Sequence, residues 1–308
     1  QSKLWHKYVI GSILEALKDN PLESGINLII NSTLPIGKGL SSSAALEIAI
    51  VNAVLKIFNI KLDDNEIIKR CQNVDHKHIG ILSGTLDQSA SQLSRKDAIL
   101  LLDFKNNSVE YINHQLSECT WILIDSMVKR ELVTSKYQER VLECKQALKE
   151  LSKKDKKISN FRDINNDDSL KFLDSILKNR ALHIIEENNR VLKMKDAILK
   201  NNPNDIGDLL YKSHLSLRDL YEVSCNEIDF LIESSKKIIY WYGGRIMGGG
   251  FGGNTINLIK KGHEDDYINT IGYAYQKKYN IMPNSYLIKF DDGVEIIDNI
   301  INNNNINN

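Results

Sequence analysis

Apolar residues recur with helical spacing in a long stretch near the start of the chain. Ala44, Ile48, Val51, Leu55 and Phe58 fall on one face of a helix, so the pattern predicts a helix over residues 44–58. The same period predicts further helices over residues 63–71, 136–152, 170–201 and 205–221. Residues 153–168 are rich in lysine and asparagine, which predicts an exposed connection.

Short apolar runs rich in β-branched residues predict strands. These runs are residues 26–33, 98–104, 120–125, 238–242, 255–259 and 285–290. Strands and helices alternate without a regular βαβ repeat, which favours an α+β fold. We expect a first domain over residues 1–130, a second over 131–298, and a disordered asparagine-rich tail over 299–308.

The composition excludes several classes of function. The chain has 308 residues, and its 40 basic residues balance 40 acidic ones, so nothing favours binding to nucleic acid or to an anionic membrane. The four cysteines lie far apart, which is typical of buried thiols in a reducing compartment and not of a zinc site. No stretch resembles a signal peptide or a membrane span. We therefore expect a cytoplasmic protein.

A glycine-rich loop precedes the first long helix, in the segment PIGKGLSSSAAL. Gly37 and Gly39 free the backbone to wrap an anion, and three hydroxyls follow at Ser41, Ser42 and Ser43. The N-terminus of a helix presents free N–H groups and the positive end of the helix dipole. The segment thus indicates a phosphate site, or else an ordinary capped helix after a glycine turn.

Two further segments accompany this loop in a fixed order. GTLDQ is predicted to be a short acidic loop that contains Asp87, and GGRIMGGGFGGNT is a glycine-dense turn over residues 243–255. With LWHKYVIG, SKYQER, HIIEENNRVL and SHLSLRDLYEVSCNEID, they span nearly the whole chain. In these segments the chain resembles the GHMP kinases, and within them the galactokinases.

The resemblance implies a two-domain GHMP kinase fold. Its first domain is like the second domain of ribosomal protein S5, and its second is ferredoxin-like. It also implies transfer of a phosphoryl group from ATP, with Mg²⁺, to the anomeric hydroxyl of galactose. The partners expected from it are these small molecules alone, and the expected state is a monomer.

Individual positions match residues with roles in the galactokinases. Asp87 is the expected catalytic base, and Gly84, Asp87 and Tyr137 the expected sugar-binding residues. The expected Mg²⁺ ligands are Ser43 and Asp75. Nucleotide binding is expected of Trp5, Gly37, Gly39, Leu40, Ser41, Ser42 and Ser43.

The chain departs from the galactokinase pattern in three places. Asp75 and His76 stand where glutamate and asparagine are usual, and Met247 replaces a threonine in the glycine-dense turn. The segment that carries an arginine and the sugar-reading acid and histidine is not found in these 308 residues. We therefore expect an N-terminally incomplete galactokinase that by itself shows no galactose-dependent ADP release.

Two alternative functions remain open at this point. One is the same chemistry on N-acetylgalactosamine or L-arabinose, and the other is an inactive, regulatory paralogue that binds ATP and sugar.

A second group of polar residues lies later in the chain. We expect an interdomain hydrogen-bond network formed by His183, Glu187, Ser213 and nearby polar residues.

Overall fold

The computed structural model describes residues 5–18, 20, 24–128, 133–164 and 167–297. The chain divides into two compact units: unit 1 is Gln1–Tyr111 with Phe290–Asn308, and unit 2 is Ile112–Lys289. The boundary expected at residue 130 falls inside unit 2, because β3 (Cys119–Asp125) pairs with later strands of that unit. The expected tail over 299–308 lies outside the described residues.

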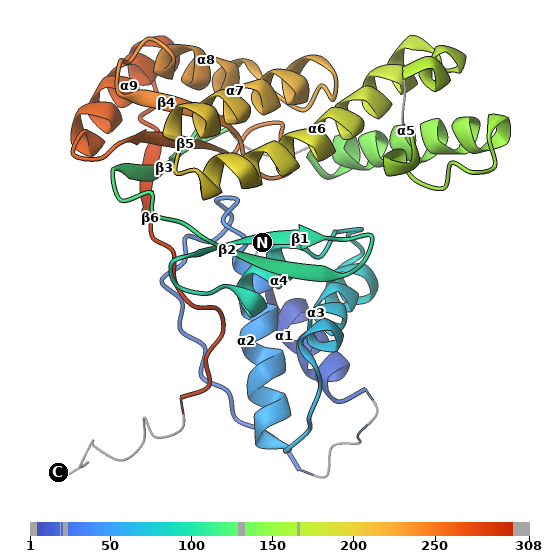
Figure 1. The fold of residues 1–308 in the computed structure, drawn as a ribbon. Coiled ribbons are helices and arrows are strands. Elements are labelled where there is room, and N and C mark those ends of the chain that lie inside the picture. Colours follow the sequence, from blue (N-terminus) through green and yellow to red (C-terminus); the bar gives the residue numbers. More distant parts are fainter. Residues whose placement is uncertain (1–4, 19, 21–23, 129–132, 165–166, 298–308) are drawn as a thin grey trace. The chain divides into compact units, whose positions relative to one another are not determined.

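Unit 1 combines helices with a β-hairpin (Figure 1). Its elements are α1 (Trp5–Ala16), α2 (Ser42–Ile57), α3 (Asp64–Asn73), a π-helical turn (Val74–Ile79), α4 (Leu86–Leu93), β1 (Ala98–Asp103) and β2 (Ser108–Asn113). The predicted helices over 44–58 and 63–71 and the strand over 98–104 are confirmed. Asp63 begins α3, because its carboxylate accepts a hydrogen bond from the backbone N–H of Glu66.

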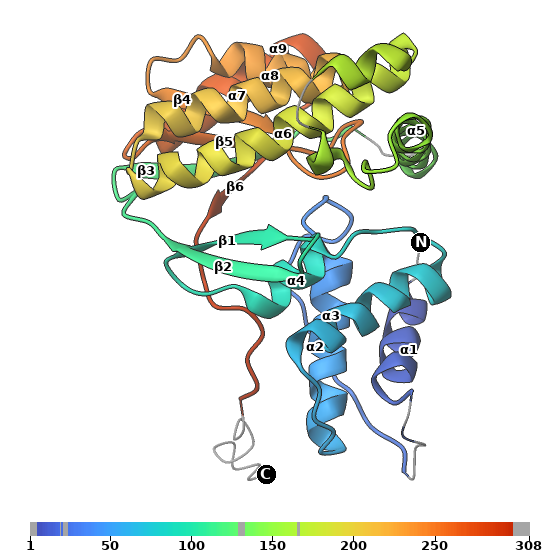
Figure 2. The ribbon, with the colours of Figure 1, turned by 45° about the vertical axis from the view of Figure 1, so that its right-hand side comes forward.

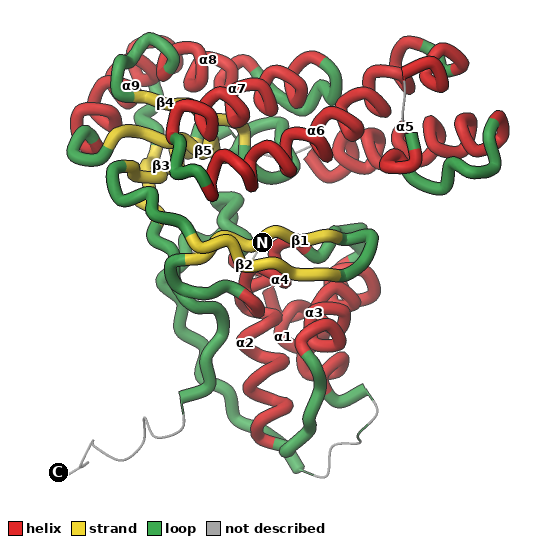
Figure 3. The backbone as a smooth tube through the Cα atoms, viewed as in Figure 1, coloured by secondary structure: helices red, strands yellow, loops and turns green. Residues whose placement is uncertain are grey.

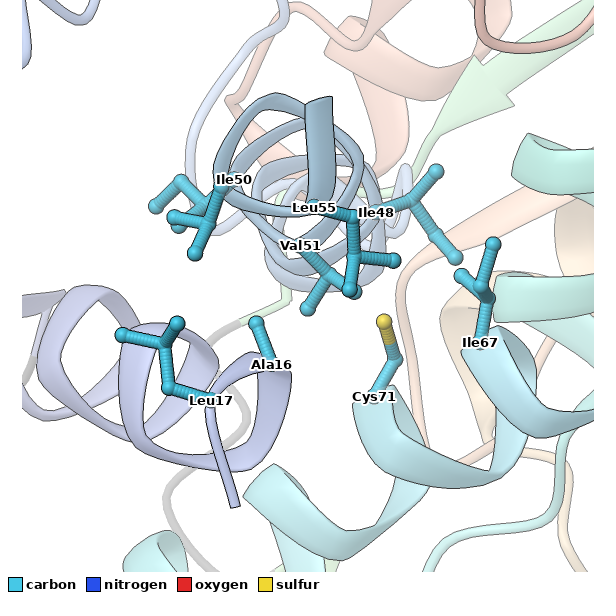
Figure 4. Close-up of a cluster of buried hydrophobic side chains, with 9 residues drawn as sticks. Ala16, Leu17, Ile48, Ile50, Val51, Leu55, Ile67 and Cys71 are labelled. Atoms are coloured by element: carbon cyan, nitrogen blue, oxygen red, sulfur yellow. The ribbon is translucent and has the colours of Figure 1, made fainter. Parts of the chain in front are cut away.

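The core of unit 1 lies where α1, α2 and α3 meet. Figure 4 shows Ala16, Leu55 and Cys71, one from each helix, with their side chains directed toward one another. Ile48 and Val51, from the predicted apolar stripe, are fully buried. Each such aliphatic side chain stabilises the fold by roughly 1.5–3 kcal/mol. This packing holds α2 against α1 and α3.

The strand predicted over residues 26–33 is wrong. These residues form part of a long irregular segment before α2 (Figure 3), and Ile29 is 100% exposed. A strand needs a hydrogen-bonded neighbour, and no described strand pairs with this segment. Its β-branched composition is therefore not sufficient to form a strand without a pairing partner.

Unit 2 is built on a four-stranded antiparallel sheet of β3, β4 (Trp241–Ile246), β5 (Asn254–Lys260) and β6 (Asn284–Ile288). The strand order is β4-β5-β3-β6, in which Ile122 pairs with Asn257 and Leu123 with Tyr286. In chain order this is 2-3-1-4 with a helix before β6, which is the ferredoxin-like arrangement. The α+β fold is confirmed.

Helices cover one face of this sheet (Figure 2). The helices of unit 2 are α5 (Val133–Lys154), α6 (Ser175–Leu199), α7 (Pro203–Asp219), α8 (Asn226–Ser235) and α9 (Glu264–Tyr279). Ile122 and Ile259 of the sheet pack with Leu231 of α8 and Ile271 of α9. The sequence predicted α5, α6 and α7 and missed α8 and α9.

The connection predicted over residues 153–168 is only partly exposed. Ile158 is buried and packs, with Leu151 of α5 and Ala181 of α6, in a separate apolar cluster. Phe161 lies on the same cluster in a short 3₁₀ turn, Phe161–Asp163. The stretch is rich in lysine, but its few apolar residues, Ile158 and Phe161, pack against the helices and hold it in place.

No described helix has the length and apolar character needed to cross a lipid bilayer.

Candidate active site

The glycine loop of unit 1 adopts a left-handed conformation at three alternate positions. The φ angles are 73° at Gly37, 71° at Gly39 and 53° at Ser41. Ser41 is the N-cap of α2, yet its side chain makes no capping hydrogen bond. Alternating left-handed residues before a helix N-terminus turn backbone N–H groups toward one side, which forms an anion-binding concavity. The local geometry therefore supports the predicted phosphate site.

Asp75 lies in the π-helical turn that follows α3 and is only 6% exposed. Its Oδ2 accepts hydrogen bonds from Ser83 Oγ at 2.7 Å and from Gln88 Nε2 at 3.1 Å. Its backbone carbonyl accepts from the N–H groups of Gly80 and Ile81, which closes the turn. π-Helical turns often lie at functional sites. The carboxylate is thus held firmly in a buried position.

Glu47 is a further candidate site residue, which the sequence pattern did not predict. It lies on α2, one turn after Ser43, and is fully buried. Gln88 Nε2 donates to Glu47 Oε2 at 3.1 Å and so bridges Glu47 and Asp75. A signal existed in the sequence, because Glu47 interrupts the apolar stripe of α2 next to Ile48.

The electrostatics of this cluster follow from burial and proximity. Burial, and next the neighbouring Asp75 carboxylate, raise the pKa of Glu47 to about 8. Burial and the charges of Asp75 and Glu47 raise the pKa of Tyr8 to about 12, against a hydrogen bond from Ser43 that lowers it. Tyr8 therefore joins Ser43, Glu47 and Asp75 in one oxygen-rich group.

Asp87 lies in the first turn of α4, where the sequence predicted a loop. Its side chain is exposed, and the preceding Gly84 is exposed with open space where a Cβ would stand. A carboxylate in the first turn is stabilised by the helix dipole, which explains why the helix begins here. The exposed carboxylate is accessible to a substrate.

Trp5 is the first described residue of α1 and is 48% exposed. Its ring centroid lies 4.1 Å from that of His6. Tyr8 follows one turn later and contacts Ser43, so α1 runs past the start of α2. The tryptophan expected to bind the nucleotide is thus carried by α1, whose Tyr8 lies next to Ser43 of the glycine loop.

In unit 2 the glycine-dense segment is more than the predicted turn. Gly243 and Gly244 belong to β4, and Asn254 and Thr255 to β5, so only the middle of the segment is a turn. A Cβ on Gly249 would lie 3.5 Å from the ring of Tyr137. Tyr137 is half-buried on α5, so the predicted sugar-binding tyrosine lies beside this turn.

The hydrogen-bond network expected between the domains lies within unit 2. Ser213 Oγ of α7 donates to Glu187 of α6 at 2.7 Å, and Arg245 of β4 donates to Ser213 Oγ at 3.0 Å. His183 Nδ1 lies 2.8 Å from Ser216 Oγ. These contacts tie α6, α7 and β4 together, so the interdomain interpretation is wrong.

A cavity of about 460 Å³ in unit 1 lies apart from the candidate site. It is lined by residues of α3, α4 and the β1–β2 hairpin, among them Thr85 and Ser89, but not by Ser43, Asp75 or Asp87. Among the described residues, no group of three or more His, Cys, Asp or Glu is arranged to hold a metal ion. A cation site here would need hydroxyl, water or phosphate oxygens as well.

Comparisons with known proteins agree with the fold and the glycine loop. A family model described as "GHMP kinases N terminal domain" matches residues 7–95. The galactokinase of Thermotoga neapolitana is 38% identical over 293 residues, covering 95% of this chain and 82% of that protein. The galactokinase of Clostridium tetani is 36% identical, covering 94% of this chain and 75% of that protein.

Solved structures give the same result. The structure of Lactococcus lactis galactokinase complexed with galactose has a TM-score of 0.88 and 30% identity, covering 95% of this chain and 76% of that chain. A mevalonate kinase structure, at 22% identity and a TM-score of 0.60, shares the fold. By its fold and glycine loop the chain is a GHMP kinase. Its identity and coverage show further that it belongs to the galactokinase family.

Proposed function

We propose that the protein is an ATP-dependent kinase that phosphorylates the anomeric hydroxyl of galactose, giving galactose 1-phosphate and ADP. The observation that carries the proposal is the pair of hydrogen bonds from Gln88 to Glu47 and Asp75. Gln88 is the neighbour of Asp87, so these bonds fix the expected base relative to the glycine loop and the buried carboxylates of unit 1.

The expected roles divide among these residues. The loop from Gly37 to Ser43 binds the ATP phosphates through backbone N–H groups, and Trp5 lies against the adenine. Gly84 and Tyr137 contact the sugar. Asp87 takes the proton from the anomeric hydroxyl while the anomeric oxygen of the sugar attacks the γ-phosphorus of ATP. The bond from the γ-phosphorus to the β,γ-bridging oxygen then breaks, which releases ADP.

Mg²⁺ fits the groups that surround the start of α2. Ser43 and Asp75 supply hard oxygen ligands, which Mg²⁺ prefers. One oxygen of Glu47 is buried there without a hydrogen-bond partner. When bound, the cation neutralises charge on the phosphates. We assign it to Ser43 and Asp75.

The test measures ADP release by the full-length gene product in a coupled assay. Galactose, N-acetylgalactosamine, L-arabinose and no sugar are compared at saturating Mg·ATP. Turnover of ~1–100 s⁻¹ with galactose, and less with the other sugars, supports the proposal. A preference for another sugar would assign that sugar instead, and binding of ATP and galactose without turnover would indicate a regulatory paralogue.

The cellular setting follows from the same proposal. A kinase that uses ATP and a free sugar works in the cytoplasm, and both substrates are small molecules. We propose a monomer, which size-exclusion chromatography with light scattering tests directly through the molecular mass.

A further inference from the structure

One carboxylate oxygen of Glu47 is buried without a hydrogen-bond partner. The side chain is 0% exposed, and its Oε2 accepts from Gln88 while its Oε1 accepts from no donor in the described chain. A buried polar atom without a partner costs about 1–3 kcal/mol, and more when it is charged. Such an oxygen calls for a ligand that the protein alone does not provide.

The groups around Glu47 are themselves oxygen-rich and acidic. Asp75 lies within hydrogen-bonding reach of Glu47, and Asp87 acts on it electrostatically. Within the described residues, neither Glu47 nor Asp75 forms an ion pair with a lysine, arginine or histidine. Two carboxylates in contact require a positive species between them, which is either a proton or a cation.

Ser43 adds a third oxygen on the same helix face. Ser43 and Glu47 are four residues apart on α2, so their side chains project from one side of the helix. Tyr8, which hydrogen-bonds to Ser43, is also close to Glu47 and Asp75. The hydroxyl and the two carboxylates are therefore grouped at the end of the glycine loop.

We propose that Glu47 Oε1 is a direct ligand of the divalent cation, in addition to Ser43 and Asp75. This inference rests on the Mg·ATP site of the proposed function. Divalent Mg²⁺ and Mn²⁺ both accept carboxylate and hydroxyl oxygens, and the nucleotide phosphates and water complete the shell. Gln88 then holds both carboxylates in place through the oxygens that it already binds.

The first experiment measures Mn²⁺ binding to the full-length protein saturated with a non-hydrolysable ATP analogue. Free Mn²⁺ is followed by electron paramagnetic resonance for the wild type and for Glu47→Gln, an isosteric change. Loss of an outer-shell partner already lowers metal affinity by about 10–100-fold, so we expect the Mn²⁺ Kd to rise at least about tenfold. A Kd within about twofold of the wild type would overturn the proposal and indicate a shared proton.

Glu15→Gln is the matched control. Glu15 is also a buried carboxylate of unit 1, but it is bound by Asn73, Lys77 and His78. We expect its substitution to leave the Mn²⁺ Kd unchanged, and circular dichroism checks the folding of both variants. An equal rise in both variants would assign the effect to the fold and overturn the ligand role.

A second measurement needs no substitution. Wild-type protein is labelled with ¹³C at the glutamate side-chain carboxyl, and electron–nuclear double resonance of bound Mn²⁺ detects a directly coordinated carboxylate carbon. We expect a strong ¹³C coupling, and its absence would overturn the proposal even where Glu47→Gln fails to fold. Galactose turnover is measured on the same sample, so failure of the kinase assignment is distinguished from failure of the ligand assignment.

Discussion

Asp87 and Gln88 are adjacent in the chain and opposite in burial. Asp87 is exposed in the first turn of α4, whereas Gln88 is 2% exposed and donates to both Glu47 and Asp75. The buried amide thus ties α4 to α2 and to the π-helical turn. The neighbouring Asp87 carboxylate stays accessible, while the buried hydrogen bonds of Gln88 fix the position of its helix.

Replacing Asp87 with asparagine should lower kcat at least ~100-fold in the full-length protein, because a general base contributes ~10²–10⁴-fold. ATP affinity should stay nearly unchanged, since the phosphate loop is intact. Steady-state kinetics with galactose and direct nucleotide titration check both parts. Asp97→Asn, at an exposed position with a φ of 61° that asparagine tolerates, is the control and should keep the wild-type kcat. An unchanged kcat in Asp87→Asn would remove this residue from catalysis.

Ser43→Ala should raise the Mg²⁺ concentration needed for half-maximal activity more than it raises the KM for galactose. The change removes one oxygen ligand from a loop that otherwise binds phosphates through its backbone. Mg²⁺ titrations of activity at fixed ATP and galactose measure the shift. Ser24→Ala, at an exposed serine before the loop, should behave as the wild type. Identical Mg²⁺ curves for Ser43→Ala and the wild type would contradict the assignment.

His183 should make the stability of the protein fall in acid. Burial is the main cause that lowers the pKa of His183 from 6.5 to about 4, and its ring also stacks on Tyr221 at 4.5 Å. Between these values only the unfolded chain binds the proton, so the stabilisation is present above pH 6.5 and is lost as the pH falls toward 4. The loss amounts to roughly 3 kcal/mol, at about 1.4 kcal/mol per pKa unit.

Urea unfolding at several pH values measures this effect. His183→Asn removes the titrating ring, so its stability should depend less steeply on pH over this range than that of the wild type. His6→Gln, at an exposed position of unit 1, is the control. Equal slopes for His183→Asn and the wild type would show that another group governs the acid response.

Gly207→Ala should destabilise unit 2 by about 1–3 kcal/mol or more, which is typical of an overpacked core. A Cβ on Gly207 of α7 would lie 2.0 Å from the carbonyl oxygen of Tyr242, so the helix could not approach β4 as it does. Gly25→Ala, where a Cβ meets open space, is the control. Thermal unfolding of both variants measures the difference, and equal melting temperatures would contradict the close approach.

Local patterns in the sequence were sufficient for much of the fold. The stripe from Ala44 to Leu55 predicted α2 because a buried helix face repeats every 3.6 residues, which neighbours in the chain already reveal. The apolar run over residues 120–125 predicted β3 because a short, continuous apolar run is typical of a buried strand. The sequence did not predict α8 and α9, because polar residues interrupt the helical repeat of their apolar residues. The residues that repeat are those buried against the sheet.

The predicted strand over residues 26–33 failed for a different reason. β-Propensity describes how a side chain fits a pleated surface, and a strand exists only when another strand accepts its hydrogen bonds. Ile29 and its neighbours have the β-branched composition of a strand, but no described strand pairs with them. The loop predicted at Asp87 was wrong because α4 is only eight residues long, which is too short for a repeating apolar pattern to indicate a helix.

The sequence by itself determined the family and the glycine loop, and it predicted Ser43, Asp75 and Asp87 as site residues, because short motifs keep their residues adjacent in the chain. Only the tertiary structure decided that Glu47 and Gln88 belong with them. Glu47 and Gln88 are 41 residues apart, and their hydrogen bond exists only once α2 and α4 are packed together. The cost of burying two carboxylates is likewise a property of that packing, since in the unfolded chain each would be solvated by water.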